Sequence, residues 1–303
     1  MGSLLAARLA RGGAEVTVAG TWREGLDAIA RRGITVEDET GHWSVPVATA
    51  PILDAGPADF VLVLVKSART ADVAGHAARA LAPGGVIVSL QNGLGNREVL
   101  AQAAGPHRVA IAVTTLGATL LGPGRVRGFP GRIVIGTTNP APVSRLVRAF
   151  RAAGIETETT ADIDRLVWRK LAVSCSVNPV SALLGVANGA LLSSAEGRAR
   201  VAAAAREAGA VAAAKGIDLQ ADPAELALDV AARTAGNRSS MLQDLDRGAA
   251  TEIDALCGAV VAEGAILAVP TPVNAALWRE VREREGRPLA VPAGAGVGMT
   301  ART

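Results

Sequence analysis

The feature that most constrains the fold is a continuous run of β-type apolar residues from Phe60 to Val65. A strand without polar residues on either side of its pleat is buried on both faces, as in a parallel sheet covered by helices. The pattern from Thr70 to Leu81 is helical, and Val86 to Leu90 is a second apolar strand. This order of strand, helix and strand predicts a doubly wound, parallel α/β sheet.

Other segments continue this alternation to about residue 160, and only helical patterns follow. We therefore predict an α/β fold of the Rossmann type over residues 1–161 and an all-α domain over residues 162–303. Asp162 is expected to cap the first helix of the second domain, and the small residues from about 288 are expected to form a flexible tail. The remaining predicted elements are strands at 16–19, 109–113, 132–136 and 155–158, a hairpin on the sheet edge at 34–47, and helices at 1–13, 142–153, 194–215, 222–236, 252–267 and 278–285.

The sequence begins with a helical pattern that leads into a strand, whereas a dinucleotide-binding βαβ unit begins with a strand. That unit carries G-x-G-x-x-G between its first strand and its first helix, and Gly2 occupies the place of the last glycine. We therefore expect the first strand and the first two glycines to lie upstream of Met1. After the second strand there is no Asp or Glu for the ribose hydroxyls, and Arg23 lies nearby, which favours NADP over NAD.

Ligands of doubly wound sheets bind at the carboxyl ends of the strands, so the residues just past each strand are candidates for binding. These are Gly20–Arg23, Lys66–Ser67, Gln91–Gly95 and Thr114–Ala118. Gly93 and Gly95 are interpreted as a turn rather than a second fingerprint, because Glu98 at the third glycine position would repel a pyrophosphate. Asn92 is then the useful side chain of that turn.

The composition excludes several classes of function. The net charge is +3 and the arginines form no dense block, which favours a small anionic ligand over a nucleic acid. The three histidines are scattered, so no metal site is predicted. Without a signal peptide or an apolar run of about 18 residues, the chain is expected to be cytoplasmic and to lack a membrane span. Cys175 and Cys257 lie in apolar helical patterns and are expected to be buried, reduced thiols.

Lys170 lies in the stretch 164–188, whose middle predicts a helix that is apolar nearly all round and therefore buried. Lys170, Ser174 and Asn178 recur at i, i+4 and i+8, so they share one helix face. Burial can lower the pKa of a lysine enough for proton transfer near neutral pH. A lysine that extends to solvent at a helix start is the alternative, and the polar residues below it favour a functional site. Lysine is also rare among the 31 basic residues, which include only Lys66, Lys170 and Lys215.

Two further segments of the helical part carry polar residues at helix starts. Residues 237–244 place two serines and an amide ahead of a helix, enough to hold a carboxylate by hydrogen bonds. A plain serine cap with Asp244 on the surface explains the same residues equally well. Residues 251–254, which include Glu252, open the next helix, where a capping box is the alternative to a site.

Five motifs occur in one order along the chain: Q-N-G-L-G at 91–95, R-K-L-A-V-S-C-S-V-N-P-V-S-A-L at 169–183, A-N-G at 187–189, S-S-M-L-Q-D at 239–244 and T-E-I-D at 251–254. Together they closely resemble the ketopantoate reductase (2-dehydropantoate 2-reductase) family over essentially the whole chain. The resemblance implies an NADPH-binding Rossmann domain, a helical second domain and a substrate cleft between them. It also implies hydride transfer from NADPH to ketopantoate, which gives pantoate for pantothenate and coenzyme A synthesis.

The resemblance further implies roles for individual residues. Lys170 corresponds to the family's proton donor to the carbonyl oxygen, and Glu252 to its glutamate near the substrate hydroxyl and the cofactor. The implied partner is a small 2-keto acid, with a homodimer as a candidate assembly. The implied substrate-binding residues are Asn92, Ser174, Asn178, Asn188 and Ser240, and the implied cofactor-binding residues are Gly2, Lys66, Asn92, Ala118 and Glu252.

The chain departs from the family pattern in three places. Ser174 replaces an asparagine and has a shorter reach, which bears on substrate fit. Thr21 stands where many members have the arginine that binds the 2′-phosphate of NADP. The first strand and the first two glycines of the fingerprint are absent from the sequence, and with them the backbone amides that hold a pyrophosphate.

Two alternatives to ketopantoate reduction remain open from the residues. One is a related enzyme that reduces another small 2-keto acid, with Ser174 widening the pocket. The other is a non-catalytic NADP-binding protein, which the incomplete fingerprint favours and the retained Lys170, Asn178, Ser240 and Glu252 oppose.

Overall fold

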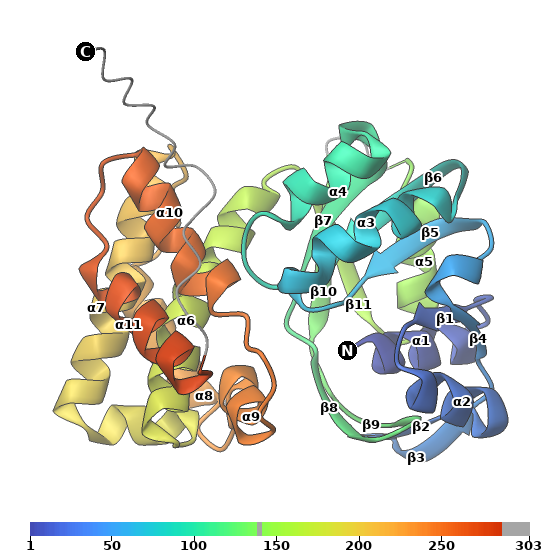
Figure 1. The fold of residues 1–303 in the computed structure, drawn as a ribbon, viewed down its shortest axis with the longest axis horizontal. Coiled ribbons are helices and arrows are strands. Elements are labelled where there is room, and N and C mark those ends of the chain that lie inside the picture. Colours follow the sequence, from blue (N-terminus) through green and yellow to red (C-terminus); the bar gives the residue numbers. More distant parts are fainter. Residues whose placement is uncertain (138–140, 287–303) are drawn as a thin grey trace, which may run out of the picture. The chain divides into compact units, whose positions relative to one another are not determined.

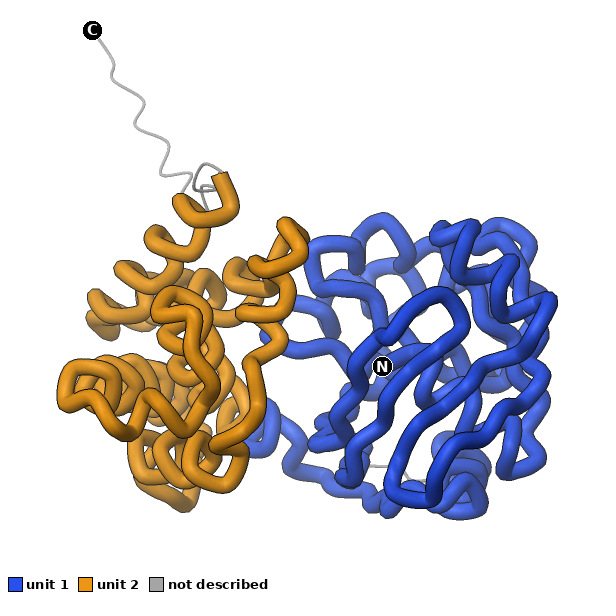
Figure 2. The backbone as a smooth tube through the Cα atoms, turned by 90° about the horizontal axis from the view of Figure 1, so that it is seen from below, with its two compact units in different colours: residues 1–167 blue, residues 168–303 orange. Residues whose placement is uncertain are grey.

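The computed structural model describes residues 1–137 and 141–286 of the chain. The chain divides into two compact units, unit 1 (Met1–Val167) and unit 2 (Trp168–Thr303) (Figure 2). Unit 1 contains the sheets and unit 2 is helical, which confirms the predicted fold class (Figure 1). The helix α6 (Ile163–Leu184) begins in unit 1 and continues into unit 2. The predicted tail from about 288 lies outside the described residues.

Unit 1 alternates strands and helices as predicted, and adds three short strands, β4, β8 and β9, that the patterns did not predict. Its elements are α1 (Gly2–Arg11), β1 (Thr17–Gly20), α2 (Arg23–Arg32), β2 (Ile34–Asp38), β3 (Gly41–Val45), β4 (Ala48–Pro51), η1 (Ile52–Asp54), β5 (Ala58–Val63), η2 (Ser67–Arg69), α3 (Thr70–Arg79), β6 (Leu81–Ser89), α4 (Asn96–Ala104), η3 (Pro106–Arg108), β7 (Val109–Thr114), β8 (Gly117–Gly122), β9 (Arg125–Phe129), β10 (Arg132–Gly136), α5 (Ser144–Ala152) and β11 (Glu156–Thr160).

The largest sheet has the strand order β11-β10-β7-β6-β5, and β1 pairs with β4 in a separate two-stranded sheet. The strands β5, β6 and β7 are parallel, as predicted, but β10 is antiparallel to β7. The prediction of a parallel strand was wrong there because β8 and β9, not a crossover helix, connect β7 to β10. Within residues 1–137 and 141–286, no strand hydrogen-bonds β1 to β5. The strand expected upstream of Met1 stays a prediction.

The strand β6 shows why the central strands of this sheet are apolar on both faces. Its residues Val86 and Val88 are fully or nearly buried in one core with Phe150 of α5, and α1 contributes to the same core. Ile87, which lies between them, packs into a second core with Leu100 of α4. Successive side chains of a strand point to opposite faces, so both faces of the sheet are covered by helices.

The predicted hairpin at 34–47 forms, with Asp38 paired to Gly41 at the turn between β2 and β3. It does not extend the edge of the main sheet as expected. Instead β2 pairs in parallel with β9, giving a four-stranded sheet of order β3-β2-β9-β8. The physical reason is a separate apolar core, in which Ile34 and Val36 of β2 pack against Leu4 of α1.

An ion pair attaches α1 to the β2–β3 turn. The Arg8 guanidinium donates to Asp38 Oδ2 at 3.0 Å, and the exposed fractions of the two side chains are 9% and 2%. Burial raises the pKa of Asp38, but hydrogen bonds from Thr40, Trp43 and Arg8 outweigh it, so that the pKa lies below its usual value. The charged carboxylate is therefore the form that the folded protein stabilises.

In unit 2, α7 packs against α8, η4, α10 and α11. At the start of α6, Asp162 Oδ1 accepts a hydrogen bond from Arg165 N at 3.4 Å, as expected of a cap. The prediction of one helix over 252–267 was wrong, because residues 254–258 form a π-helical turn before the α-helix resumes. The remaining elements of unit 2 are η4 (Asn188–Ser193), α7 (Ala195–Ala214), α8 (Pro223–Arg233), α9 (Ser240–Asp246), η5 (Asp254–Gly258), α10 (Ala259–Ile266) and α11 (Pro272–Arg284).

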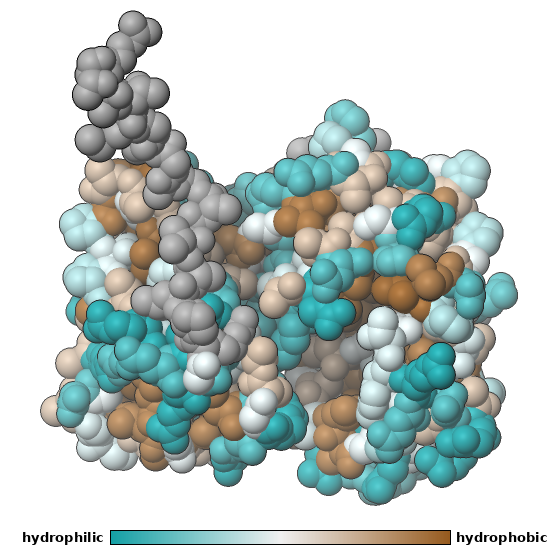
Figure 3. Space-filling view, in the orientation of Figure 1, coloured by the Kyte–Doolittle hydropathy of each residue, from teal (hydrophilic) through white to brown (hydrophobic). Residues whose placement is uncertain are grey.

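On the face drawn in Figure 3, hydrophilic residues are interspersed with smaller apolar areas in both units. The most exposed large apolar side chains are Leu53 and Ile266, at 75% and 78% of their full accessibility. No helix within the described ranges 1–137 and 141–286 has both the length and the apolar content needed to cross a membrane.

Candidate active site

The polar face predicted for α6 is present in the structure. Lys170, Ser174 and Asn178 are partly exposed, while residues between them, including Leu171 and Cys175, are buried. The helix is continuous across all three polar positions, so they share one face, as the spacing predicted. A mostly buried helix thus presents one line of polar groups.

Pro179 lies inside α6 and lacks the N–H that would bond the carbonyl of Cys175, four residues earlier. The thiol of Cys257, on η5, donates to that carbonyl, with Sγ 3.1 Å from the oxygen. Both cysteines are free and buried, which confirms the sequence prediction. Burial raises the pKa of Cys175 and of Cys257 far above the ordinary value of a thiol, so neither is a nucleophile at neutral pH.

Lys170 and Glu252 interact electrostatically within unit 2. Burial lowers the pKa of Lys170 to about 8, and the charge of Glu252 opposes this by raising it. Glu252 is itself partly exposed and precedes η5. A lysine with a pKa close to neutral can release its proton to a substrate oxygen, which an ordinary surface lysine does far less readily.

At the C-terminal end of the polar face of α6, near Asn178, the helix is hydrogen-bonded to the serine segment before α9. Ser181 Oγ and Ser239 Oγ lie 2.7 Å apart, and both lie within hydrogen-bonding distance of the Asn178 carbonyl, at 3.0 and 3.3 Å. Ser239 caps α9 by accepting from Leu242 N. Ser240, the first residue of α9, is exposed.

The structure confirms the serine cap of the alternative reading, and carboxylate binding by this segment stays a prediction. The cap is Ser239, so the hydroxyl of Ser240 is not needed for that purpose. The alternative that placed Asp244 on the surface was wrong, because Asp244 is only 3% exposed and accepts a hydrogen bond from Arg247 at 2.8 Å.

Asn188, at the start of η4, is buried beside the same segment. Its backbone N–H donates to Asn237 O at 2.9 Å, and its side-chain Nδ2 donates to Thr234 Oγ1 at 2.9 Å. Among the residues that the structure describes, its buried Oδ1 has no hydrogen-bond donor. A buried acceptor of this kind is suited to a donor supplied by a ligand.

In unit 1, Lys66 and Asn92 follow the adjacent parallel strands β5 and β6. The Asn92 carbonyl accepts from Ser67 Oγ at 2.7 Å and from Asn96 Nδ2 at 3.1 Å. Buried Thr70 donates to Asn96 Oδ1 at 2.8 Å. This network fixes the two loops against each other. Sequence reasoning missed Thr70 and Asn96, although a polar residue at the start of each helix that follows a buried strand was the available signal.

The other predicted cofactor residues of unit 1 have different surroundings. Gly2 is the first residue of α1. Ala118 lies in β8, where it pairs with Gly128, and is not in the main sheet. Thr21 and Arg23 are exposed after β1. Lys66 is also exposed.

A Rossmann-type unit with polar loops past its strands, followed by a helical unit with a lysine of lowered pKa, defines the class of nicotinamide-dependent two-domain oxidoreductases. Two family models match: "Ketopantoate reductase PanE/ApbA" over residues 1–140 and "Ketopantoate reductase PanE/ApbA C terminal" over residues 162–285. The chain belongs to the ketopantoate reductase family.

Individual relatives agree with this assignment. A 2-dehydropantoate 2-reductase from Halobacterium salinarum is 40% identical over 298 residues, covering 94% of this chain and 97% of that protein. One from Pyrococcus horikoshii is 34% identical over 289 residues, covering 94% of each. A PanE/ApbA family ketopantoate reductase from Ralstonia eutropha has a crystal structure with TM-score 0.86 and 33% identity, covering 92% of this chain and 93% of that one. A D-mandelate dehydrogenase structure, 23% identical with TM-score 0.85, shares the fold.

Proposed function

We propose that this protein reduces 2-dehydropantoate to pantoate with NADPH, the step implied for pantothenate and coenzyme A synthesis. The observation that carries the proposal is Lys170, which combines a pKa of about 8 with a position on the polar face of α6 that it shares with Ser174 and Asn178. The reductases that match over nearly the whole chain support the choice of substrate.

In this proposal residues 1–161 bind the cofactor and residues 162–303 carry the substrate groups. The features of unit 1 fit a dinucleotide. Lys66 supplies an exposed positive charge past β5, and Gly2 lies at the start of a helix, where phosphates are favourably bound. Asn92 and the backbone near Ala118 line the nicotinamide side. Arg23, rather than Thr21, is the candidate partner for the 2′-phosphate of NADPH.

Lys170 acts as the general acid. When bound, NADPH supplies the hydride for the 2-keto carbon. Lys170 protonates the carbonyl oxygen, so that negative charge does not accumulate there in the transition state. Glu252 raises the pKa of Lys170, which keeps a larger fraction of the lysine protonated at neutral pH. In this proposal Glu252 also contacts the substrate hydroxyl and the cofactor.

The remaining polar groups orient the substrate. Ser174 and Asn178 continue the Lys170 face, and Asn188 Oδ1 is a buried acceptor suited to a substrate hydroxyl. The exposed hydroxyl of Ser240 is suited to donate to the substrate carboxylate, because Ser239 already caps α9. Several such groups hold the substrate in the reactive orientation, so less of the entropic cost of aligning the reactants remains in the chemical step.

One observation favours a second substrate. Ser174 stands on the polar face of α6 where the resemblance gives an asparagine, and a serine leaves more room. A reductase for another small 2-keto acid would use the same Lys170 chemistry. A panel of 2-keto acids of different side-chain size separates the two, since the preferred substrate has the highest kcat/KM.

The test measures NADPH oxidation with ketopantoate by the protein, by Lys170→Ala and by Lys215→Ala. Lys215 is the matched control, because it is another lysine of the same unit and its ammonium pairs with Glu263, in an ion pair between the end of α7 and α10. Activity that Lys170→Ala loses and Lys215→Ala keeps supports the proposal. Turnover that survives in Lys170→Ala contradicts it, and tight NADPH binding without turnover of any keto acid supports the non-catalytic alternative.

Further measurements address the cofactor and the assembly. We propose NADPH rather than NADH, and kcat/KM for each nucleotide tests it, with Arg23→Ala expected to reduce the preference. We also propose a cytoplasmic location and a homodimer. Fractionation of cells and light scattering after size exclusion test these two statements.

A further inference from the structure

The segment that carries Glu252 has an unusual backbone. The carbonyl of Glu252 accepts from both Ala255 N and Leu256 N, at 3.0 and 3.1 Å, and Gly258 N donates to Ile253 O at 3.0 Å. The last bond spans five residues and belongs to the π-turn η5. Such turns are rare and occur often at functional sites, because they insert one extra residue and redirect the chain.

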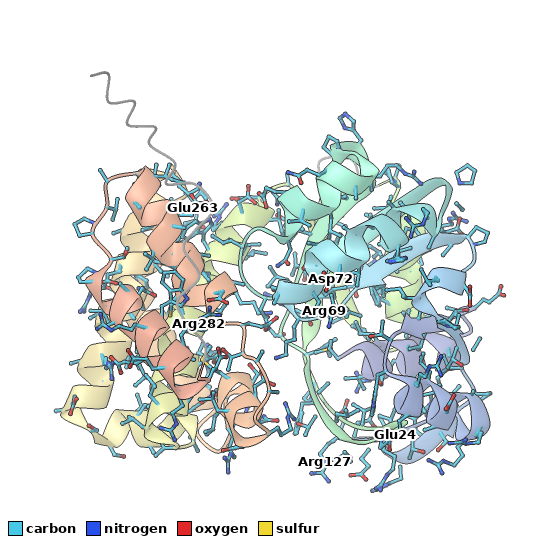
Figure 4. The ribbon with its side chains drawn as sticks, viewed as in Figure 1. Glu24, Arg69, Asp72, Arg127, Glu263 and Arg282 are labelled. Carbon is cyan, nitrogen blue, oxygen red and sulfur yellow. The ribbon has the colours of Figure 1, made fainter. Side chains whose placement is uncertain are left out.

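Two residues of α11, and Glu285 directly after it, bind this segment. Trp278 Nε1 donates to Asp254 Oδ1 at 2.7 Å, and Arg282 donates to Asp254 Oδ2 at 2.9 Å. Glu285 Oε1 accepts from Thr251 N at 2.6 Å. Trp278, Arg282 and Glu285 are spaced i, i+4 and i+7 and therefore lie on one face; we call them the α11 clamp. Arg282 is labelled on this helix in Figure 4.

The ion pair of the clamp joins a buried guanidinium to the carboxylate of Asp254, whose side chain is 37% exposed. The Arg282 side chain is only 5% exposed, and a buried guanidinium is strongly unfavourable unless a carboxylate pairs with it. Asp254 supplies that carboxylate while accepting from Trp278 with its other oxygen. A Cβ on Gly258 would lie 3.1 Å from the Trp278 ring, so the turn also packs closely on the clamp.

The turn is also attached to α6. Cys257 donates to the Cys175 carbonyl that Pro179 leaves without its helical partner. Cys175 lies five residues after Lys170 on the same helix, so the turn is fixed to the helix that carries the lysine. The segment with Glu252 is thus held between α11 and α6.

We infer that Asp254 is a positioning residue: through Trp278 and Arg282 it fixes the turn that holds Glu252 where its charge acts on Lys170. The inference rests on the proposed function in one respect, because that function makes Lys170 and Glu252 the catalytic pair. The position of Glu252 can be measured without turnover, because its charge changes how readily Lys170 is protonated.

The first experiment titrates the lysines by NMR after labelling their ε-carbons with ¹³C. The chain has only three lysines, Lys66, Lys170 and Lys215, so the Lys170 signal is assigned by its loss in Lys170→Met. Glu252→Gln removes the charge that raises the pKa of Lys170, so its titration moves to lower pH. Asp254→Asn is expected to move it in the same direction, because the turn loses its ionic partner.

The control is Glu280→Gln. It removes another ion pair of α11, that with Arg200 of α7, and leaves the clamp intact. The titration of Lys170 is expected to stay at its original pH in this variant. In the double variant Asp254→Asn with Glu252→Gln, no shift beyond that of Glu252→Gln is expected, because Asp254 acts only through Glu252.

A second readout is catalytic. Asp254→Asn is expected to lower kcat/KM for the keto acid by about 10- to 100-fold, with NADPH affinity retained, as for a misplaced catalytic group. Should Asp254→Asn fail to fold, Trp278→Phe removes the Nε1 donor and keeps a ring against Gly258.

The inference is overturned if Asp254→Asn leaves the Lys170 titration unchanged while Glu252→Gln moves it, or if the double variant moves it further than Glu252→Gln alone. It is also overturned if Glu252→Gln has no effect on Lys170. A wild-type protein that reduces no keto acid contradicts the proposed function, and the titration still decides the role of Asp254.

Discussion

Replacing Lys170 with methionine should abolish reduction and change how stability depends on pH. Burial lowers the pKa of Lys170 from 10.5, the value of an exposed lysine, to about 8. Between these two values the unfolded chain binds more protons than the folded chain, so the wild-type free energy of unfolding rises with pH in that window. Lys170→Met lacks this contribution because methionine does not titrate.

The magnitude follows from the two pKa values. At pH 7 the charged lysine lowers the free energy of unfolding by about 3 kcal/mol, and at pH 9.5, where the folded lysine is mostly neutral, by about 1 kcal/mol. The wild type should therefore gain about 2 kcal/mol relative to Lys170→Met between pH 7 and pH 9.5. Solvent screens the exposed part of the side chain, so this gain is an upper value.

The assay is urea unfolding of both proteins, followed by circular dichroism at pH 7 and pH 9.5. The chain contains no Tyr, and every other titratable group is common to both proteins, so only Lys170 contributes to the difference. The reasoning would be refuted if the wild type and Lys170→Met differed in free energy of unfolding by the same amount at both pH values. It would also be refuted if the difference moved in favour of Lys170→Met at high pH.

Three further predictions concern other parts of the chain. Arg8→Ala leaves the nearly buried Asp38 carboxylate without its cation and should lower the free energy of unfolding, measured in urea, by about 3–5 kcal/mol. Arg8 is one of the groups that lower the pKa of Asp38 in the folded protein, so without it less stability should be lost than in the wild type when the pH falls below about 4. Cys175 and Cys257 should not react with a thiol reagent in the native protein, and both should react in urea; reaction of the folded protein would contradict their burial. Asn96→Ala removes donors and acceptors from the buried loop network and should weaken NADPH binding about tenfold in a fluorescence titration. Equal NADPH affinity of Asn96→Ala and the wild type would contradict this prediction.

Local pattern was sufficient for the elements whose residues interact mainly with near neighbours. The apolar strand at Phe60 and the helix from Thr70 are present because burial on both faces and helical periodicity are properties of short segments. The Lys170 face was equally accessible, since i, i+4 spacing fixes the face whatever the helix packs against. Only the ends moved, by a few residues, as helix and strand ends depend on local hydrogen bonds.

Local pattern was insufficient where a distant partner decides the conformation. The strand β10 is antiparallel to β7 because of the two short strands between them, and Ile34 belongs to a second core with Leu4 rather than to the sheet edge. The helix expected over 252–267 was interrupted at η5, whose π-turn is held by α11. Gly258 and Asp254 have low helix propensity, but such residues also occur inside regular helices, so propensity alone does not specify a π-turn.

The sequence by itself determined the fold class, the family and the residue types of the candidate site, because motif, spacing and periodicity are written along the chain. Only the tertiary structure decided that Ser239 is the cap and Ser240 is left exposed, that Asp244 is buried, and that the pKa of Lys170 lies near 8. These properties depend on desolvation and on charges brought close by folding. Glu252 is 82 residues from Lys170 along the chain, a separation across which no local pattern can report an electrostatic interaction.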